Sequence, residues 1–237
     1  LEGWFEQRGR DLRAANIFDT LKAGSAVDDF VLYLRPFAST DQISETHANV
    51  VPIRGGVGAP TAHLVGEDRL EFEAVIETAL GKFGPLIALG EPMEHMGAGR
   101  IKVTDETWQE AVRLLLDKAR LVVLLPSSRE GTLWEVDHIL ASDVKAKTLV
   151  IDPPNELGGQ GDYDPAQEWG HVRSAFEKHG VQLPEDDPLG LIVRLSDVGT
   201  PKAVRRLHLN NKSPIRRMAK DILSAAEEPV RAKRKRG

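Results

Sequence analysis

The feature that most constrains the fold is a repeated alternation of short apolar runs with longer amphipathic segments. Each apolar run is rich in Val, Ile and Leu and is followed by Pro, Gly or polar residues, which is typical of buried strands. There are five such runs, at 30–34, 86–89, 121–125, 148–151 and 191–195. Uniformly apolar strands separated by helices form a parallel sheet covered on both faces. We therefore predict a three-layer α/β/α domain with about five strands.

The segments between the strands have helical periodicity. Apolar residues in 72–83 recur at intervals of three and four, and Asp68 with Glu71 forms a capping-box pattern. The last helix is indicated by Ser213 as N-cap and Pro214 at the first helical position. The same reasoning predicts further helices over 106–119, 132–141 and 165–179, and a brief extra strand at 101–103.

The domain organisation is simple. We expect residues 1–27 to be an N-terminal extension, 28–226 to be the α/β domain with a C-terminal sheet and helix extension, and 227–237 to be a basic tail. The chain begins with Leu rather than Met, which indicates a fragment or a processed chain, and a membrane anchor could precede it. The longest wholly aliphatic run has five residues, far fewer than the roughly 20 that span a bilayer. A cytoplasmic domain, membrane-tethered in the full-length protein, is the expected location.

Composition narrows the chemistry and the partners. The absence of Cys excludes disulfides, thiolate metal sites and Cys nucleophiles. No His pair has metal-ligand spacing, so we expect no metal cofactor. The net charge is −5, yet residues 201–237 carry twelve Lys and Arg against three Asp and Glu. This basic end is either a solvated terminus or a contact for an anionic membrane. It lacks interleaved aromatic residues, and we expect no specific nucleic-acid partner.

In a parallel sheet, ligands bind beyond the carboxyl ends of the strands. Four predicted loops lie there, at 35–41, 90–100, 126–131 and 152–155. In the second loop, Gly97 and Gly99 could bring backbone N–H groups close to a phosphate, with Arg100 adding positive charge. A plain turn is the alternative interpretation.

The third loop leads from a buried strand into a helix that carries Trp134 and Glu135. This places a carboxylate beside a large aromatic ring at the mouth of the sheet. A purely structural role is the alternative, with the ring in the core and Glu135 complementing the helix dipole. Arg35, at the end of the first strand, could likewise hold a ligand phosphate or form an ion pair with Glu135 or Asp41.

These motifs together resemble a bacterial Toll/interleukin-1 receptor (TIR)-like domain. The resemblance rests on Phe30-Val-Leu-Tyr-Leu-Arg-Pro-Phe37, on the helix and strand ending at Gly90, on the segment from Trp108 to Leu125, and on Leu133-Trp-Glu135. It covers roughly residues 28–152. It implies a flavodoxin-like fold and a signalling or defence effector that cleaves the nicotinamide–ribose bond of NAD, sometimes with cyclisation of the product.

The resemblance also implies roles for particular residues. Glu135 matches the catalytic glutamate of the family, and Phe37 and Ser39 match the aromatic and serine residues of its first loop. NAD is then a substrate. Trp134 or Phe37 would stack on its rings, and Arg35 or Arg100 would meet its pyrophosphate.

Two other functions fit the same residues. The family's Ser/Trp-Cys spacing ahead of the glutamate is not reproduced, because Trp134 directly precedes Glu135. This departure favours a non-catalytic module that signals by self-association. A nucleotide or nucleoside sensor, or a deoxyribosyltransferase-like enzyme, is the third possibility, since such sheets present a glutamate at the same place.

Overall fold

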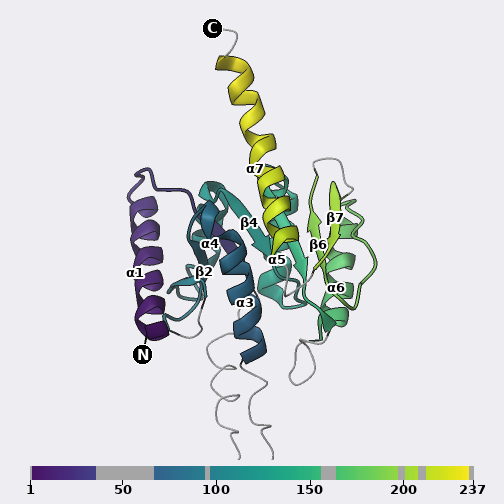
Figure 1. Ribbon diagram of the computed structural model, residues 1–237, viewed down its shortest axis with the longest axis horizontal. Helices are drawn as coiled ribbons and strands as arrows, with labels where there is room; N and C mark the ends of the chain where they lie inside the picture. The colour runs from purple at the N-terminus through teal and green to yellow at the C-terminus, as the bar shows by residue number, and fades with distance from the viewer. Residues whose placement is uncertain are drawn as a thin grey trace, which may run out of the picture.

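A computed structural model of the chain describes residues 2–35, 67–93, 97–155, 164–196, 201–207 and 212–234 (Figure 1). Its centre is one seven-stranded sheet with the order β3-β2-β1-β4-β5-β6-β7. The strands are β1 (Val31–Leu34), β2 (Leu86–Leu89), β3 (Gly99–Ile101), β4 (Leu121–Leu124), β5 (Thr148–Asp152), β6 (Leu191–Arg194) and β7 (Ala203–Arg206). The α/β fold with a mostly parallel sheet is confirmed.

The five strands from β3 to β5 are parallel, and β1 pairs with both β2 and β4. Every residue of β1 and of its two neighbours is buried, which explains their uniformly apolar sequences. Two features differ from the prediction. The sheet has seven strands rather than five, and β6 and β7 are antiparallel to their neighbours. β7 could not be predicted from an apolar run, because three of its four residues are exposed.

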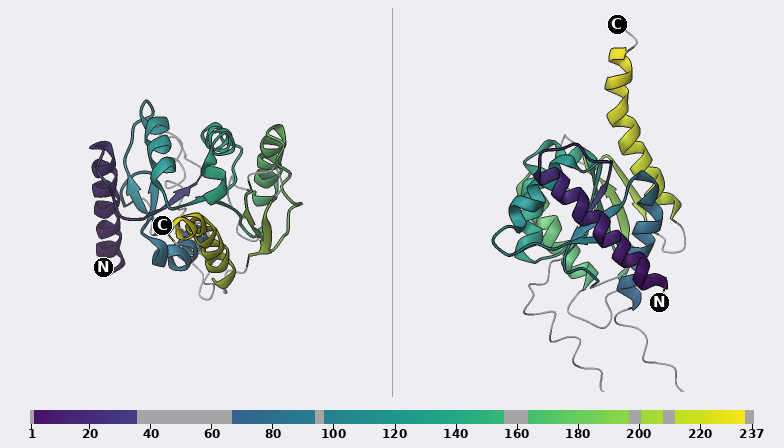
Figure 2. Two further views of the ribbon diagram at one scale, coloured as in Figure 1. Left: turned by 90° about the horizontal axis from the view of Figure 1, so that it is seen from above. Right: turned by 90° about the vertical axis from the view of Figure 1, so that its left-hand side faces the viewer.

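Helices cover both faces of the sheet, which gives three layers (Figure 2). One face carries α4 (Trp108–Lys118), α5 (Glu130–Leu140) and α6 (Pro165–Lys178), and the other carries α3 (Glu67–Leu80) and α7 (Ser213–Arg234). These five helices were all predicted from periodicity and capping. Two short 3-10 turns, η1 (Gly81–Phe83) and η2 (Asp143–Lys147), precede β2 and β5.

The N-terminal segment is a helix, α1 (Glu2–Lys22), that lies along the β3 edge of the sheet (Figures 1 and 2). Ala14 and Leu21 enter the same hydrophobic core as α4 and α5. The approach is close at Gly99, where an added Cβ would lie 2.4 Å from the carbonyl oxygen of Arg10. The segment expected to extend from the domain is therefore packed against it.

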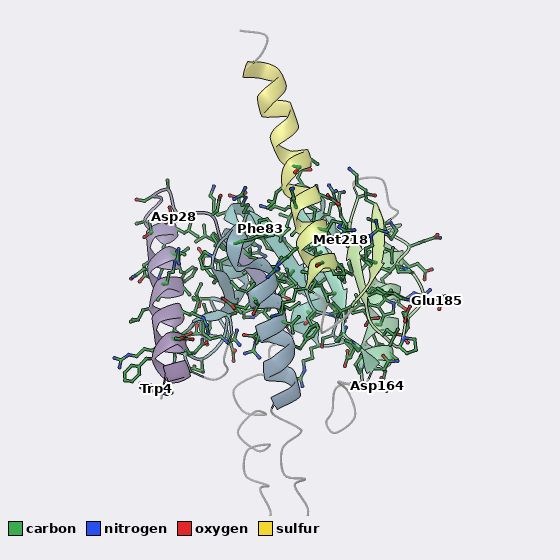
Figure 3. The ribbon with its side chains drawn as sticks, in the orientation of Figure 1. Trp4, Asp28, Phe83, Asp164, Glu185 and Met218 are labelled. Atoms are coloured by element: carbon green, nitrogen blue, oxygen red, sulfur yellow. The ribbon has the colours of Figure 1, made fainter. Side chains whose placement is uncertain are left out.

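The carboxyl ends of the parallel strands lie at one end of the molecule. Figure 3 shows Asp28 and Phe83, which precede β1 and β2, at the opposite end from Asp164, which caps α6. The last turns of α7 project from the body on the Asp28 side (Figure 1). In the part of the chain that the structure describes, no helix is long and apolar enough to cross a bilayer.

Candidate functional site

The loop between β4 and α5 is held in place by side chains on both sides. The hydroxyl of Ser127, which is buried, accepts a hydrogen bond from the Arg129 N–H at 3.2 Å. Glu168 of α6 accepts from the backbone N–H of Ser128, and also from its hydroxyl at 3.2 Å. The start of α5 is thereby fixed at the carboxyl end of the sheet, where α/β domains bind ligands.

The inward face of α5 changes character along its length. Its buried residues follow the spacing of one helical stripe, and they are Thr132, Glu135, Val136, Ile139 and Leu140. The last three are apolar and pack into the core beneath the sheet. The first two are polar and lie nearest the carboxyl ends of the strands. Hydrophobic burial thus anchors the end of α5, while its beginning presents two oxygen-bearing side chains to the interior.

Among the described residues, neither of these polar side chains has a hydrogen-bond partner. Thr132 is 1% exposed and Glu135 is 7% exposed, yet Thr132 Oγ1 and Glu135 Oε2 are buried without a partner. Buried polar atoms in proteins are almost always hydrogen-bonded, because leaving one unsatisfied costs about 1–3 kcal/mol. These two atoms lie one helical turn apart, which makes the start of α5 the candidate site.

The carboxyl of Glu135 has an unusual affinity for its proton. Burial raises the pKa of Glu135 from its usual value of 4.5 to about 8, and no charged group among the described residues contributes to this shift. The free carboxyl is therefore mostly neutral at pH 7. The sequence raised an ion pair between Glu135 and Arg35 as one alternative, but Arg35 is not among the causes of the pKa shift of Glu135. A buried carboxyl without a counter-charge has the electrostatics of a binding or catalytic group.

Trp134 lies beside Glu135 in sequence but belongs to a different face of α5. Its ring makes an edge-to-face contact with Trp108 of α4, at 4.9 Å between centroids. It also stacks on His138 at 5.4 Å, and the Arg113 guanidinium lies 5.0 Å from its centroid. Three side chains of the protein therefore contact this ring, and the prediction that it stacks on a nucleotide is not supported.

The Gly97–Arg100 loop has a structural role instead of the predicted phosphate-binding role. Its backbone N–H groups already donate to side chains of α1 and α3. Gly97 donates to Gln7 at 2.9 Å and Arg100 to Asp11 at 2.8 Å, both in α1, and Ala98 donates to Glu73 of α3 at 2.7 Å. The guanidinium of Arg100 is 1% exposed and bonds both carboxylate oxygens of Glu73 at 2.8 Å. The loop therefore ties α1 and α3 to β3, and Gly97, Gly99 and Arg100 are withdrawn as candidate ligands of a phosphate.

Arg35 follows β1 directly and is partly buried. Its charge acts on Tyr33, whose pKa is raised by burial and by the charge of Glu73, and lowered by Arg35 and Arg100. Tyr33 belongs to the core on the α3 face, whereas α5 packs on the other face. The structure thus associates Arg35 with the α3 side of the sheet. Phe37 and Ser39 lie outside the described residues.

Sequence reasoning missed two polar residues at this end of the sheet, Thr132 and Asp186. Thr132 could have been found from its i, i+3 relation to Glu135, which places both on one helix face. Asp186 carries no such signal, because it lies in a loop whose position depends on the tertiary fold. Among the described residues, no group of three or more His, Asp or Glu side chains is placed to hold a metal ion.

Comparisons of this chain with family models, with curated proteins and with solved structures found no match.

Proposed function

We propose that this chain is a TIR-like NAD glycohydrolase in which Glu135 is the catalytic residue. The observation that carries the proposal is the Glu135 carboxyl itself. It is buried at the carboxyl end of the sheet, and the described residues provide neither a hydrogen-bond partner for Oε2 nor a charge that compensates the carboxylate. The resemblance to TIR-like domains supplies the reaction.

The chemistry needs few groups. The bond between C1′ of the ribose and the nicotinamide nitrogen breaks, and its electron pair leaves with nicotinamide, which becomes neutral. No general acid is required for that step. The positive charge left on the ribose resembles an oxocarbenium ion, and a carboxylate beside it stabilises the transition state electrostatically. Water then adds to C1′ and gives up a proton. In a cyclising reaction, a nucleophilic atom of the same dinucleotide replaces the water.

The raised pKa of Glu135 suits both steps. The nicotinamide ring of bound NAD is cationic, so it favours the ionised carboxylate and lowers the pKa of that group in the complex. A carboxylate with a pKa near 8 is also a stronger base toward the attacking water than an ordinary one. We expect kcat/KM to rise with pH and to level off above about 8, because the free enzyme must lose the Glu135 proton.

The test is release of free nicotinamide from NAD by the purified chain, measured by chromatography. Glu135→Gln should lower the rate at least about 100-fold. Glu130→Gln provides a matched control on the exposed first turn of the same helix, and it should retain activity. Undiminished turnover by Glu135→Gln contradicts the assignment. So does a wild-type chain that binds NAD without cleaving it, even at concentrations that promote assembly, and that outcome favours the nucleotide-sensor alternative.

A further inference from the structure

A second group of unpartnered oxygen atoms lies where β5 ends. Asp152, the last residue of β5, is completely buried, and neither of its carboxylate oxygens accepts a hydrogen bond from a described residue. The side-chain oxygens Asn155 Oδ1 and Asp186 Oδ1 are also buried, again with no partner in the described part of the chain. These three side chains therefore offer four acceptor oxygens that none of the described residues satisfies.

The three side chains belong to one cluster. The Asn155 amide donates from Nδ2 to Asp186 Oδ2 at 3.3 Å. Asp186 in turn lies close enough to Asp152 for its negative charge to act on the Asp152 carboxyl. The free oxygens of the cluster thus come from the end of β5 and from the 181–190 loop.

The backbone around the cluster is closely packed. The Asn155 N–H donates to the Pro188 carbonyl at 3.1 Å, and Asp152 is the register partner of Leu191 in β6. At Gly190, with φ +81°, an added Cβ would lie 2.6 Å from the Asp152 carbonyl oxygen. Only glycine allows this approach. The two segments that carry the oxygens are therefore held together by main-chain contacts rather than by the carboxylates.

No Lys, Arg or His in the described part of the chain pairs with the carboxylates of this cluster. Arg206 is nearby, but its Nε pairs with Asp187 Oδ2 at 2.6 Å. Within the described ranges, no Lys, Arg or His forms an ion pair with Asp152 or Asp186. A proton shared between these two carboxyls would satisfy one acceptor and leave the remaining oxygens without a donor. A multiply charged ion would satisfy all four at once.

We propose that Asp152, Asn155 and Asp186 bind a hard divalent cation, Mg²⁺ or Ca²⁺. Carboxylate and amide oxygens are the ligands that these ions prefer, and water completes their coordination. Two carboxylates with an amide match the sparse protein ligation of Mg²⁺, whereas a bidentate Asp152 would suit Ca²⁺. The cluster contains neither imidazole nor thiolate, which argues against zinc. This site is independent of NAD cleavage by Glu135.

The experiment is thermal unfolding of the EDTA-treated full chain at pH 7.5, with MgCl₂, CaCl₂ or NaCl of equal ionic strength. A cation that binds only the folded state should raise Tm by about 5–10 °C at one hundred times its Kd. The ion that produces the larger shift at equal concentration identifies the cation. Isothermal titration calorimetry of the same protein should give one site per chain.

Variants test the ligands. Asp152→Asn should abolish the cation-dependent shift in Tm. Asp186→Asn, in a partly exposed loop position, should weaken cation binding and raise the Kd at least tenfold. Asp137→Asn is the control, because that carboxylate is exposed and pairs with His179 elsewhere. The proposal is overturned if neither divalent ion raises the Tm of the wild-type chain. It is overturned equally if both site variants keep the wild-type shift.

Discussion

Two buried carboxylate sites in this chain have similar exposure and opposite surroundings. At the α1–β3–α3 junction, Asp11 accepts from Gln7 and from the backbone N–H groups of Met93 and Arg100. Glu73 accepts there from the Arg100 guanidinium and from the Ala98 N–H. At the start of α5, Glu135 has neither a cation nor a donor for Oε2 among the described residues. Carboxylates that are equally buried can therefore differ completely in their hydrogen bonds, and it is the hydrogen bonds that separate the structural junction from the candidate site.

The largest expected effect is at the bonded site. Glu73→Ala should lower the free energy of unfolding by about 3–5 kcal/mol, because it leaves the Arg100 charge buried and uncompensated. Denaturant titration measures the change. The double variant Glu73→Leu with Arg100→Met should recover most of the loss, since it removes both charges. A loss below about 1 kcal/mol in Glu73→Ala would show that this ion pair does not hold α3 to β3.

At Glu135, removal of the carboxylate charge is expected to stabilise the chain rather than destabilise it. The pKa of Glu135 is about 8 in the folded chain and near 4.5 when unfolded, so the folded state holds the proton more tightly. Its contribution to stability is complete below pH 4.5 and is lost progressively between pH 4.5 and 8. Glu135→Gln, which mimics the protonated form, should therefore stabilise the chain by roughly 3 kcal/mol at pH 7.

The pH dependence provides the control for this expectation. The stability difference between wild type and Glu135→Gln should vanish near pH 4.5 and grow steadily toward pH 8. Glu130→Gln, on the exposed first turn of α5, should change stability by less than about 1 kcal/mol at any of these pH values. A Glu135→Gln variant that is less stable than wild type at pH 7 would mean that the carboxylate is satisfied in the native protein.

The smallest effect compares two buried threonines. Thr132→Val removes an unpartnered hydroxyl and should stabilise the chain by about 1 kcal/mol. Thr148→Val removes a hydroxyl that donates to the Val144 carbonyl at 2.9 Å, and it should destabilise by a similar amount. Calorimetric unfolding of the two variants measures both. If both variants changed the free energy of unfolding in the same direction, the hydroxyl of Thr132 would not differ from the hydrogen-bonded hydroxyl of Thr148.

The layers of the fold could be predicted from local patterns. α4 and α7 bury one apolar stripe each, and β1 and β4 are buried on both faces, so their sequences report their environment directly. α1 could not be recognised in this way. Its inward face contains Gln7 and Asp11 as well as Ala14 and Leu21, because half of it meets the polar Gly97–Arg100 loop rather than the core.

The candidate site was predictable only in part. Glu135 could be placed at the mouth of the sheet because it follows a buried strand by a short loop and lies within one helix. The partners proposed for it could not be tested from the sequence. Arg100 looked available until the fold brought Glu73 to it from 27 residues away. The sequence suggested that Trp134 could stack on a nucleotide, but in the fold Trp108 of α4 packs against its ring.

The order of apolar runs and amphipathic stripes settled the α/β architecture and the end of the sheet at which chemistry belongs, because these patterns reflect burial that is local along the chain. Which polar groups remained without partners was decided by tertiary contacts alone. Hydrogen bonds and ion pairs form between residues that are distant in sequence, as between Asp11 and the Arg100 backbone. The oxygens of Glu135 and Asp152 that have no partner among the described residues could therefore be recognised only from the tertiary structure.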